Sequence, residues 1–170
     1  MEIPSLPVLS FRRIVNTEKD VPMPHFGLMN EDALGPVQGP LQRAMLHIRG
    51  GKRRFRQGKI SAGIVTYYDA LSSAMQWYLA LPARRSKLAV RGDEDLLNDR
   101  TAYAVLVRSG VLDGRFDFAA FDKLTEHALL NEMPGYDYRT VLEGVDAVME
   151  QLGVMPFDEA DLPPEDPKTF

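Results

Sequence analysis

The residue types that carry most enzyme chemistry are few and widely separated in this sequence. Cysteine is absent, which excludes a thiol nucleophile, a disulfide and a Cys-ligated zinc site. The three histidines, His25, His47 and His127, lie on separate segments. None has a second histidine three or four residues away, the spacing that places two metal ligands on one helix face. The sequence therefore favours a non-enzyme with no metal and no cofactor, and it names no catalytic residue.

Two pairs of carboxylates have the four-residue spacing that brings both groups to one face of a helix. They are Asp95 with Asp99, and Asp122 with Glu126. Paired carboxylates can serve general acid and base chemistry. We expect both pairs to lie on the solvated faces of polar helices, where they would have no catalytic role.

A glycine- and lysine-containing run in the first half of the chain superficially resembles a phosphate-binding loop. Six residues separate Gly51 from Gly58, where that loop has four, and Lys59 is followed by Ile60 and Ser61 instead of directly by a hydroxyl residue. A preceding strand is not predicted either. The pattern therefore does not indicate a nucleotide-binding loop.

Positive charge is the most unusual feature of the first half. Residues 33–92 hold eleven Lys or Arg and one acid, whereas residues 93–170 hold six basic and eighteen acidic residues, within a net charge of −4. Such asymmetry indicates either an anionic partner such as RNA or a nucleotide, or two halves that face each other within the fold or across a dimer interface. We favour the second interpretation. The candidate anion-binding residues are Arg49, Lys52, Arg53, Arg54, Arg56 and Lys59.

The long apolar stretch from Ile60 to Leu81 predicts the central helix around which the chain is organised. Its large apolar residues recur at steps of three and four, the period of one buried helix face. A second stripe of mostly small residues would let neighbouring helices approach closely. Only a narrow strip that includes Asp69 and Gln76 remains polar, as expected for a helix at the centre of a bundle.

Similar periodicity elsewhere predicts an all-α fold, a four- or five-helix up-and-down bundle. The first helix is expected to begin near Pro40, because proline is tolerated in a first turn. Gly50 and Gly51 would either break it or mark a close helix crossing. The later helices are expected to have the N-caps Asp93, Asp117 and Asp137, with Leu97 and Leu129 on inner faces and Gly153 at the last end.

Proline and charge divide the chain into three parts. Residues 1–36 are rich in proline and predict an arm without a long helix, in which 10–16 could form a short extended piece. Residues 37–153 are the predicted bundle. Residues 154–170 are acidic and rich in proline, a composition that does not favour independent order. The absence of cysteine, of a leader-like segment and of a membrane-length apolar run predicts a soluble, cytoplasmic protein with no membrane partner.

One stretch resembles a known family. Residues 51–81 contain F-R-Q-G-K followed by A-G-I-V-T-Y-Y-D-A-L-S-S-A-M, and residues 106–114 read L-V-R-S-G-V-L-D-G. These segments resemble helices of the HEPN superfamily (higher eukaryotes and prokaryotes nucleotide-binding domains). The resemblance implies a helical bundle, often dimeric, that is tied to RNA or nucleotide handling. The R-x(4–6)-H motif of its catalytic members is absent, because only three residues separate Arg43 from His47, so no catalytic residue is transferred.

Two functions therefore remain open from the sequence. The first is a non-catalytic helical interaction and oligomerisation module that forms a homodimer or higher oligomer. The second is a HEPN-like domain that binds RNA or a nucleotide through the basic run at residues 49–59.

Overall fold

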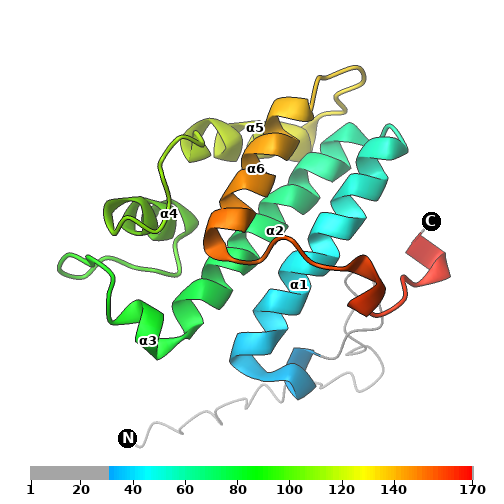
Figure 1. The fold of residues 1–170 in the computed structure, drawn as a ribbon. Helices are drawn as coiled ribbons and strands as arrows, with labels where there is room; N and C mark the ends of the chain where they lie inside the picture. Colours follow the sequence, from blue (N-terminus) through cyan, green and yellow to red (C-terminus); the bar gives the residue numbers. More distant parts are fainter. Residues whose placement is uncertain (1–30, 170) are drawn as a thin grey trace, which may run out of the picture.

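The structure is a computed structural model that describes residues 31–169 of the chain. Within that range it contains helices and no strand, which confirms the all-α class and the helical bundle (Figure 1). The residues 10–16 and His25 lie outside the described range. The elements in chain order are α1 (Glu31–Arg56), α2 (Ile60–Ala80), α3 (Pro82–Arg85), α4 (Asp99–Arg108), α5 (Phe118–Leu130), α6 (Arg139–Leu152) and the short 3₁₀ helices η1 (Glu159–Asp161) and η2 (Pro167–Thr169).

Helix α2 lies at the centre of the bundle, as the sequence predicts, and α1, α5 and α6 all pack against it (Figure 1). Its predicted apolar stripe is buried: Leu71 is 0% exposed and Met75 is 1% exposed. Asp69 and Gln76 of the predicted polar strip are exposed. The helix ends one residue earlier than predicted, because Leu81 has extended backbone angles ahead of Pro82.

The glycines of the α1–α2 hairpin mark a close crossing and do not break α1. A Cβ atom on Gly51 would lie 2.4 Å from the ring of Tyr67, and one on Gly63 would lie 2.6 Å from the ring of Phe55. Real Cβ atoms do not come so close to other heavy atoms. Gly51 of α1 therefore makes room for a ring of α2, and Gly63 of α2 makes room for a ring of α1.

Helix α1 begins earlier than Pro40, so that prediction is wrong. The helical segment starts at Glu31 and is kinked at Gly35, whose φ of 78° and ψ of −178° are not helical. The regular part resumes at Pro36 directly after the kink. Pro36 therefore occupies the first-turn position that the sequence analysis gave to Pro40.

The start of the third predicted helix is also wrong, since α4 begins at Asp99 and not near Asp93. The N-cap is Asn98, whose side chain accepts a hydrogen bond from the Thr101 amide at 3.1 Å. The acids that precede it serve turns instead: Glu94 accepts from the Arg91 amide. Acidic residues satisfy turn amides as well as helix amides, so their presence did not fix the boundary.

Helices α5 and α6 follow their predicted positions with two local differences. Asp117 caps α5 as predicted, and Gly153 ends α6 with a left-handed φ of 84°. Asp137 is not the N-cap of α6; its carboxylate binds both the amide and the guanidinium of Arg139. Leu129 is 65% exposed, so it does not belong to the inner face of α5. Leu97 precedes α4 and is 86% exposed, so it does not belong to the inner face of a helix either.

Residues 154–169, here called the C-terminal strap, lie across α1 (Figure 1). Val154 and Leu162 are buried, and Arg49 of α1 donates to the carbonyl oxygen of Pro163 at 2.8 Å. The composition of this acidic segment predicts that it does not become ordered by itself. The surface of α1 supplies the burial and the cations that the segment lacks.

None of the helices in residues 31–169 has both the length and the apolar character needed to span a membrane.

The central position of α2 leads to a stability prediction. We expect Leu71→Asp to unfold the protein, because an uncompensated buried carboxylate costs several kcal/mol, comparable with the stability of a small domain. Far-UV circular dichroism during thermal denaturation measures the effect. Gln76→Asp is the matched control, since Gln76 is exposed on the same helix. A Leu71→Asp protein with unchanged helicity and melting temperature would show that the stripe is not core.

Candidate functional site

The six predicted anion-binding residues do not share one environment. Arg53 is 6% exposed, Arg49, Lys52 and Arg54 are partly buried, and only Arg56 and Lys59 are exposed. The basic run therefore does not present a single cationic face to solvent. Anion binding by these residues stays a prediction, and the two exposed side chains near the α1–α2 turn are its most accessible members.

Arg49 and Arg53 contact a carboxylate of the chain itself. Glu165 of the strap lies with Oε1 3.7 Å from Arg49 Nε and 3.3 Å from Arg53 Nε. The Glu165 side chain is 14% exposed, so the group is largely desolvated. A buried cation without a nearby anion would be costly. The carboxylate of the strap therefore compensates the positive charge of these two arginines of α1.

Lys52 faces a second carboxylate, on α6. Its Nζ lies 3.5 Å from Asp146 Oδ2, and the hydroxyl of Tyr67 donates to Asp146 Oδ1 at 3.4 Å. Burial raises the pKa of Asp146, and the neighbouring Lys52 ammonium opposes that rise. Burial also raises the pKa of Tyr67, with Asp146 adding to the effect. This polar cluster joins α1, α2 and α6.

Arg54 contributes to the hairpin. Its Nη1 donates to the Thr66 hydroxyl at 3.0 Å and to the Ala62 carbonyl at 3.4 Å, both on α2. Burial lowers the pKa of the Arg54 guanidinium, and the adjacent Arg53 lowers it further. Arg54 therefore faces the helix interface and not solvent.

The other candidates for chemistry are not brought together. His47 is buried at 3% exposure in α1, whereas His127 is exposed on α5. Within residues 31–169, no group of three His, Asp or Glu side chains is placed to hold a metal ion.

The carboxylate pairs differ from the prediction of solvated helix faces. Asp95 precedes α4 and shares no helix with Asp99, which accepts a hydrogen bond from the Ser72 hydroxyl at 2.9 Å. Asp122 forms an ion pair with Arg100, and Arg100 also lies 3.9 Å from Glu126. These contacts tie α4 to α2 and α5.

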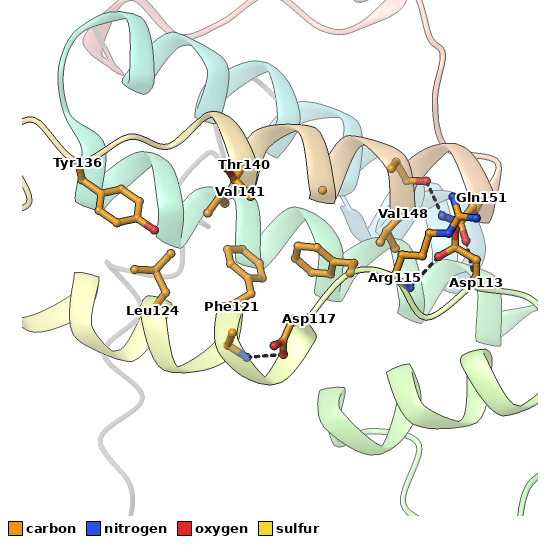
Figure 2. A pocket seen from close by; sticks show the side chains of 14 residues that line it. Asp113, Arg115, Asp117, Phe121, Leu124, Tyr136, Thr140, Val141, Val148 and Gln151 are labelled. Carbon is orange, nitrogen blue, oxygen red and sulfur yellow. Dashed lines mark hydrogen bonds and ion pairs between the residues drawn. The ribbon is translucent and has the colours of Figure 1, made fainter.

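A mainly apolar groove lies between α5 and α6. Both helices pack on α2, yet they barely contact each other, and the residues ahead of α5 line the space between these two walls. The groove has a volume of about 640 Å³ (Figure 2). It is lined by Asp113, Arg115, Phe116, Asp117, Ala120, Phe121, Leu124, Tyr136, Thr140, Val141, Gly144, Ala147, Val148 and Gln151.

The middle of the groove is apolar, and one of its two ends is polar. Phe121 lies at the centre, while Leu124 and Tyr136 lie toward one end and Asp113 and Gln151 lie at the other (Figure 2). The amide of Asp113 donates to Gln151 Oε1 at 2.8 Å, which closes that end with a hydrogen bond between the loop and α6.

Small residues on α6 make room for this groove. A Cβ atom on Gly144 would lie 2.6 Å from the ring of Phe116, so only glycine lets that ring rest against α6. Thr140, Ala147 and Gln151 share the face of Gly144 by helical spacing. The large apolar residues of α6 do not predict the groove, because the small residues leave the space. In the sequence, the groove is indicated by the helical spacing of four α6 residues without large apolar side chains, Thr140, Gly144, Ala147 and Gln151.

Comparison with protein-family models, with characterised proteins and with solved structures finds no match for this chain. The resemblance to the HEPN superfamily therefore stays a prediction based on the segments quoted above.

The contacts of the basic run lead to a second prediction. We expect Arg53→Gln to lower the free energy of unfolding by about 1–3 kcal/mol, because it removes a cation from a largely buried ion pair. Arg56→Gln is the matched control on the same helix and should leave the melting temperature unchanged, since Arg56 is exposed. Thermal denaturation of both variants measures the difference.

The opposite pattern would support the interpretation as an anion-binding surface. In that case Arg53→Gln would keep the wild-type melting temperature, and wild-type protein would retain random RNA on filters more strongly at about 50 mM salt than at 200 mM.

The Lys52–Asp146 contact leads to a prediction with a pH dependence. The pKa of Asp146 in the folded state is raised above its unfolded value of about 3.9. The free energy of unfolding therefore decreases as pH rises from the unfolded pKa through the folded pKa, because the carboxyl ionises less readily in the folded protein. Lys52→Met removes the cation that limits this decrease. We therefore expect the variant to lose more stability at pH 7, by about 1–3 kcal/mol, than at pH 3.5, where the carboxyl is protonated.

Urea denaturation at the two pH values measures the loss, with the exposed Lys59→Met as control. Equal destabilisation at both pH values would mean that Lys52 acts through packing and not through the charge of Asp146.

Proposed function

We propose that this protein is a non-catalytic helical interaction module and that it binds through the groove between α5 and α6. The observation that carries the proposal is the apolar groove itself. Phe116, Phe121 and Leu124 line a hollow of about 640 Å³ that the bundle does not fill. Sites that bind ligands are typically concave, mainly apolar and about 300–1,000 Å³ in volume.

The polar groups of the groove support binding and not turnover. Asp117 Oδ1 accepts from the Ala120 amide at 2.9 Å, and Asp113 Oδ1 accepts from the Arg115 amide at 3.0 Å. Both carboxylates therefore have structural duties in capping and turning the chain. A general base needs a carboxylate or imidazole aimed at a substrate proton.

The competing proposal is the HEPN-like domain that binds RNA or a nucleotide. Its remaining support is the exposure of Arg56 and Lys59 near the turn between α1 and α2. The contacts of Arg49, Lys52 and Arg53 with the chain's own carboxylates favour the interaction module instead. Self-association into a homodimer and a cytoplasmic location stay predictions.

Blocking the groove tests the proposed function. We expect Ala120→Trp to fill it and to abolish the fluorescence enhancement of ANS, a dye that reports exposed apolar surface. Ala120 is an exposed lining residue, so the change should leave the fold intact. Ala119→Trp is the matched control, because Ala119 is exposed on the same helix but does not line the groove.

Sedimentation of the same three proteins at tens of micromolar tests self-association. A shift from a dimer to a species of 19.1 kDa in Ala120→Trp alone would place the homodimer contact at the groove. Equal ANS binding by all three proteins would contradict the proposal that the groove is the binding surface.

A further inference from the structure

We infer that the groove between α5 and α6 accepts one amphipathic helix of a partner protein, with its apolar face inward and basic residues along its edges. This inference rests on the proposed function and specifies the class of partner. It follows from the length of the groove, the character of its walls and the charge of its surroundings.

The length of the groove matches about three turns of helix. Its lining on α6 runs from Thr140 to Gln151, and a rise of about 1.5 Å per residue makes that distance roughly 16 Å. Tyr136 and Leu124 lie toward one end, Phe121 lies in the middle and Val148 lies toward the other end (Figure 2). A helix with apolar residues at i, i+4 and i+7 would place one side chain at each of these levels.

The walls of the groove suit a helix because both are themselves helices with small residues facing inward. Gly144 and Ala147 on α6 and Ala120 on α5 line the groove. Small side chains at these positions let a third helix approach both walls closely. The ring of Phe116 already rests on Gly144, so the incoming side chains would meet an aromatic floor.

The charge around the groove selects a basic partner. Residues 113–152 contain nine acids and three Lys or Arg. Among these acids, Asp122, Asp137 and Asp146 already form ion pairs with basic residues of the chain. Glu143 and Glu150 are exposed on α6, one turn on either side of Ala147, and neither forms an ion pair within residues 31–169. Asp113 adds an exposed carboxylate at one end, and Asp117, the N-cap of α5, adds another nearer the middle (Figure 2).

The cations that α1 carries do not neutralise this surface. Lys52 is held at Asp146, and Arg49 and Arg53 are held at Glu165 of the strap. Arg115 lines the groove, but its Nε lies 3.8 Å from Asp113 Oδ2, so it is already close to an acid. Lysine or arginine on the edges of a bound helix would meet the acidic rim, which favours such a helix over an acidic one.

Fluorescence anisotropy with two labelled model peptides tests the inference. The peptides share leucines at i, i+4 and i+7 on an alanine-rich helix, and they differ only in flanking Lys or flanking Glu residues. We expect the wild-type protein to bind the Lys peptide at least tenfold more tightly than the Glu peptide. The preference should shrink between about 50 mM and 200 mM salt, because exposed charges are screened.

Variants separate the groove from its charge. Ala120→Trp should weaken binding of the Lys peptide at least tenfold, whereas Ala119→Trp should bind as the wild type does. The double change Glu143→Gln and Glu150→Gln should reduce the affinity for the Lys peptide severalfold and flatten its salt dependence. Circular dichroism of each variant confirms that the fold is intact.

Several results would overturn the inference. Equal affinity for both peptides would remove the charge selection, and unchanged binding by Ala120→Trp would place the peptide elsewhere. If neither peptide binds while Ala120→Trp still abolishes ANS binding or dimerisation, the occupant is a small apolar molecule or a second copy of this chain. In that case the partner class is wrong but the proposed function stands. If Ala120→Trp also changes neither ANS binding nor sedimentation, both the inference and the proposed function fail.

Discussion

The close contact between α1 and α2 positions much of the rest of the bundle. Gly51 and Gly63 each make room for an aromatic ring, and both rings then reach α6. Phe55 stacks on Tyr138 with ring centroids 4.2 Å apart, and the hydroxyl of Tyr67 donates to Asp146. The two glycines therefore set the helix spacing and, through the rings they admit, the position of one groove wall.

The second wall is positioned by a separate set of contacts. Tyr68 of α2 lies 5.7 Å from Phe121, between ring centroids, and Arg100 of α4 pairs with Asp122. These interactions fix α5 against α2 and α4 without involving α6. The groove lies between α5 and α6 because different aromatic and polar contacts hold each helix on the same central helix, with Phe116 in contact with both walls.

The distribution of charge follows from the same arrangement. The cations of α1 lie near the core, where burial requires that anions approach them, and the strap and α6 supply those anions. The acids of α5 and α6 that are not needed for this purpose remain at the surface. Part of the charge asymmetry seen in the sequence is thus neutralised by ion pairs inside the molecule.

The sequence predicts the helices best where a single physical cause decides the structure. The period of the apolar residues is enough to place α2, and local capping chemistry is enough for Asp117 and Gly153. Prediction failed where two causes compete. The acids at 93–95 suit either a helix start or a turn, and the strap gains order only from the surface of α1. The groove was missed because the small residues of α6, beginning with Gly144, leave space instead of filling it.

The separation of α5 from α6 has a consequence for how this protein can change over evolutionary time. Residues that share no neighbour usually affect stability additively, whereas residues in contact do not. A substitution on the groove face of α5, such as one at Ala120, therefore carries little penalty that depends on the residue at Ala147 of α6. The two walls can drift separately, with Phe116 as a described link between them. The groove face should therefore tolerate substitution more readily than the hairpin of α1 and α2, in which each ring requires its glycine.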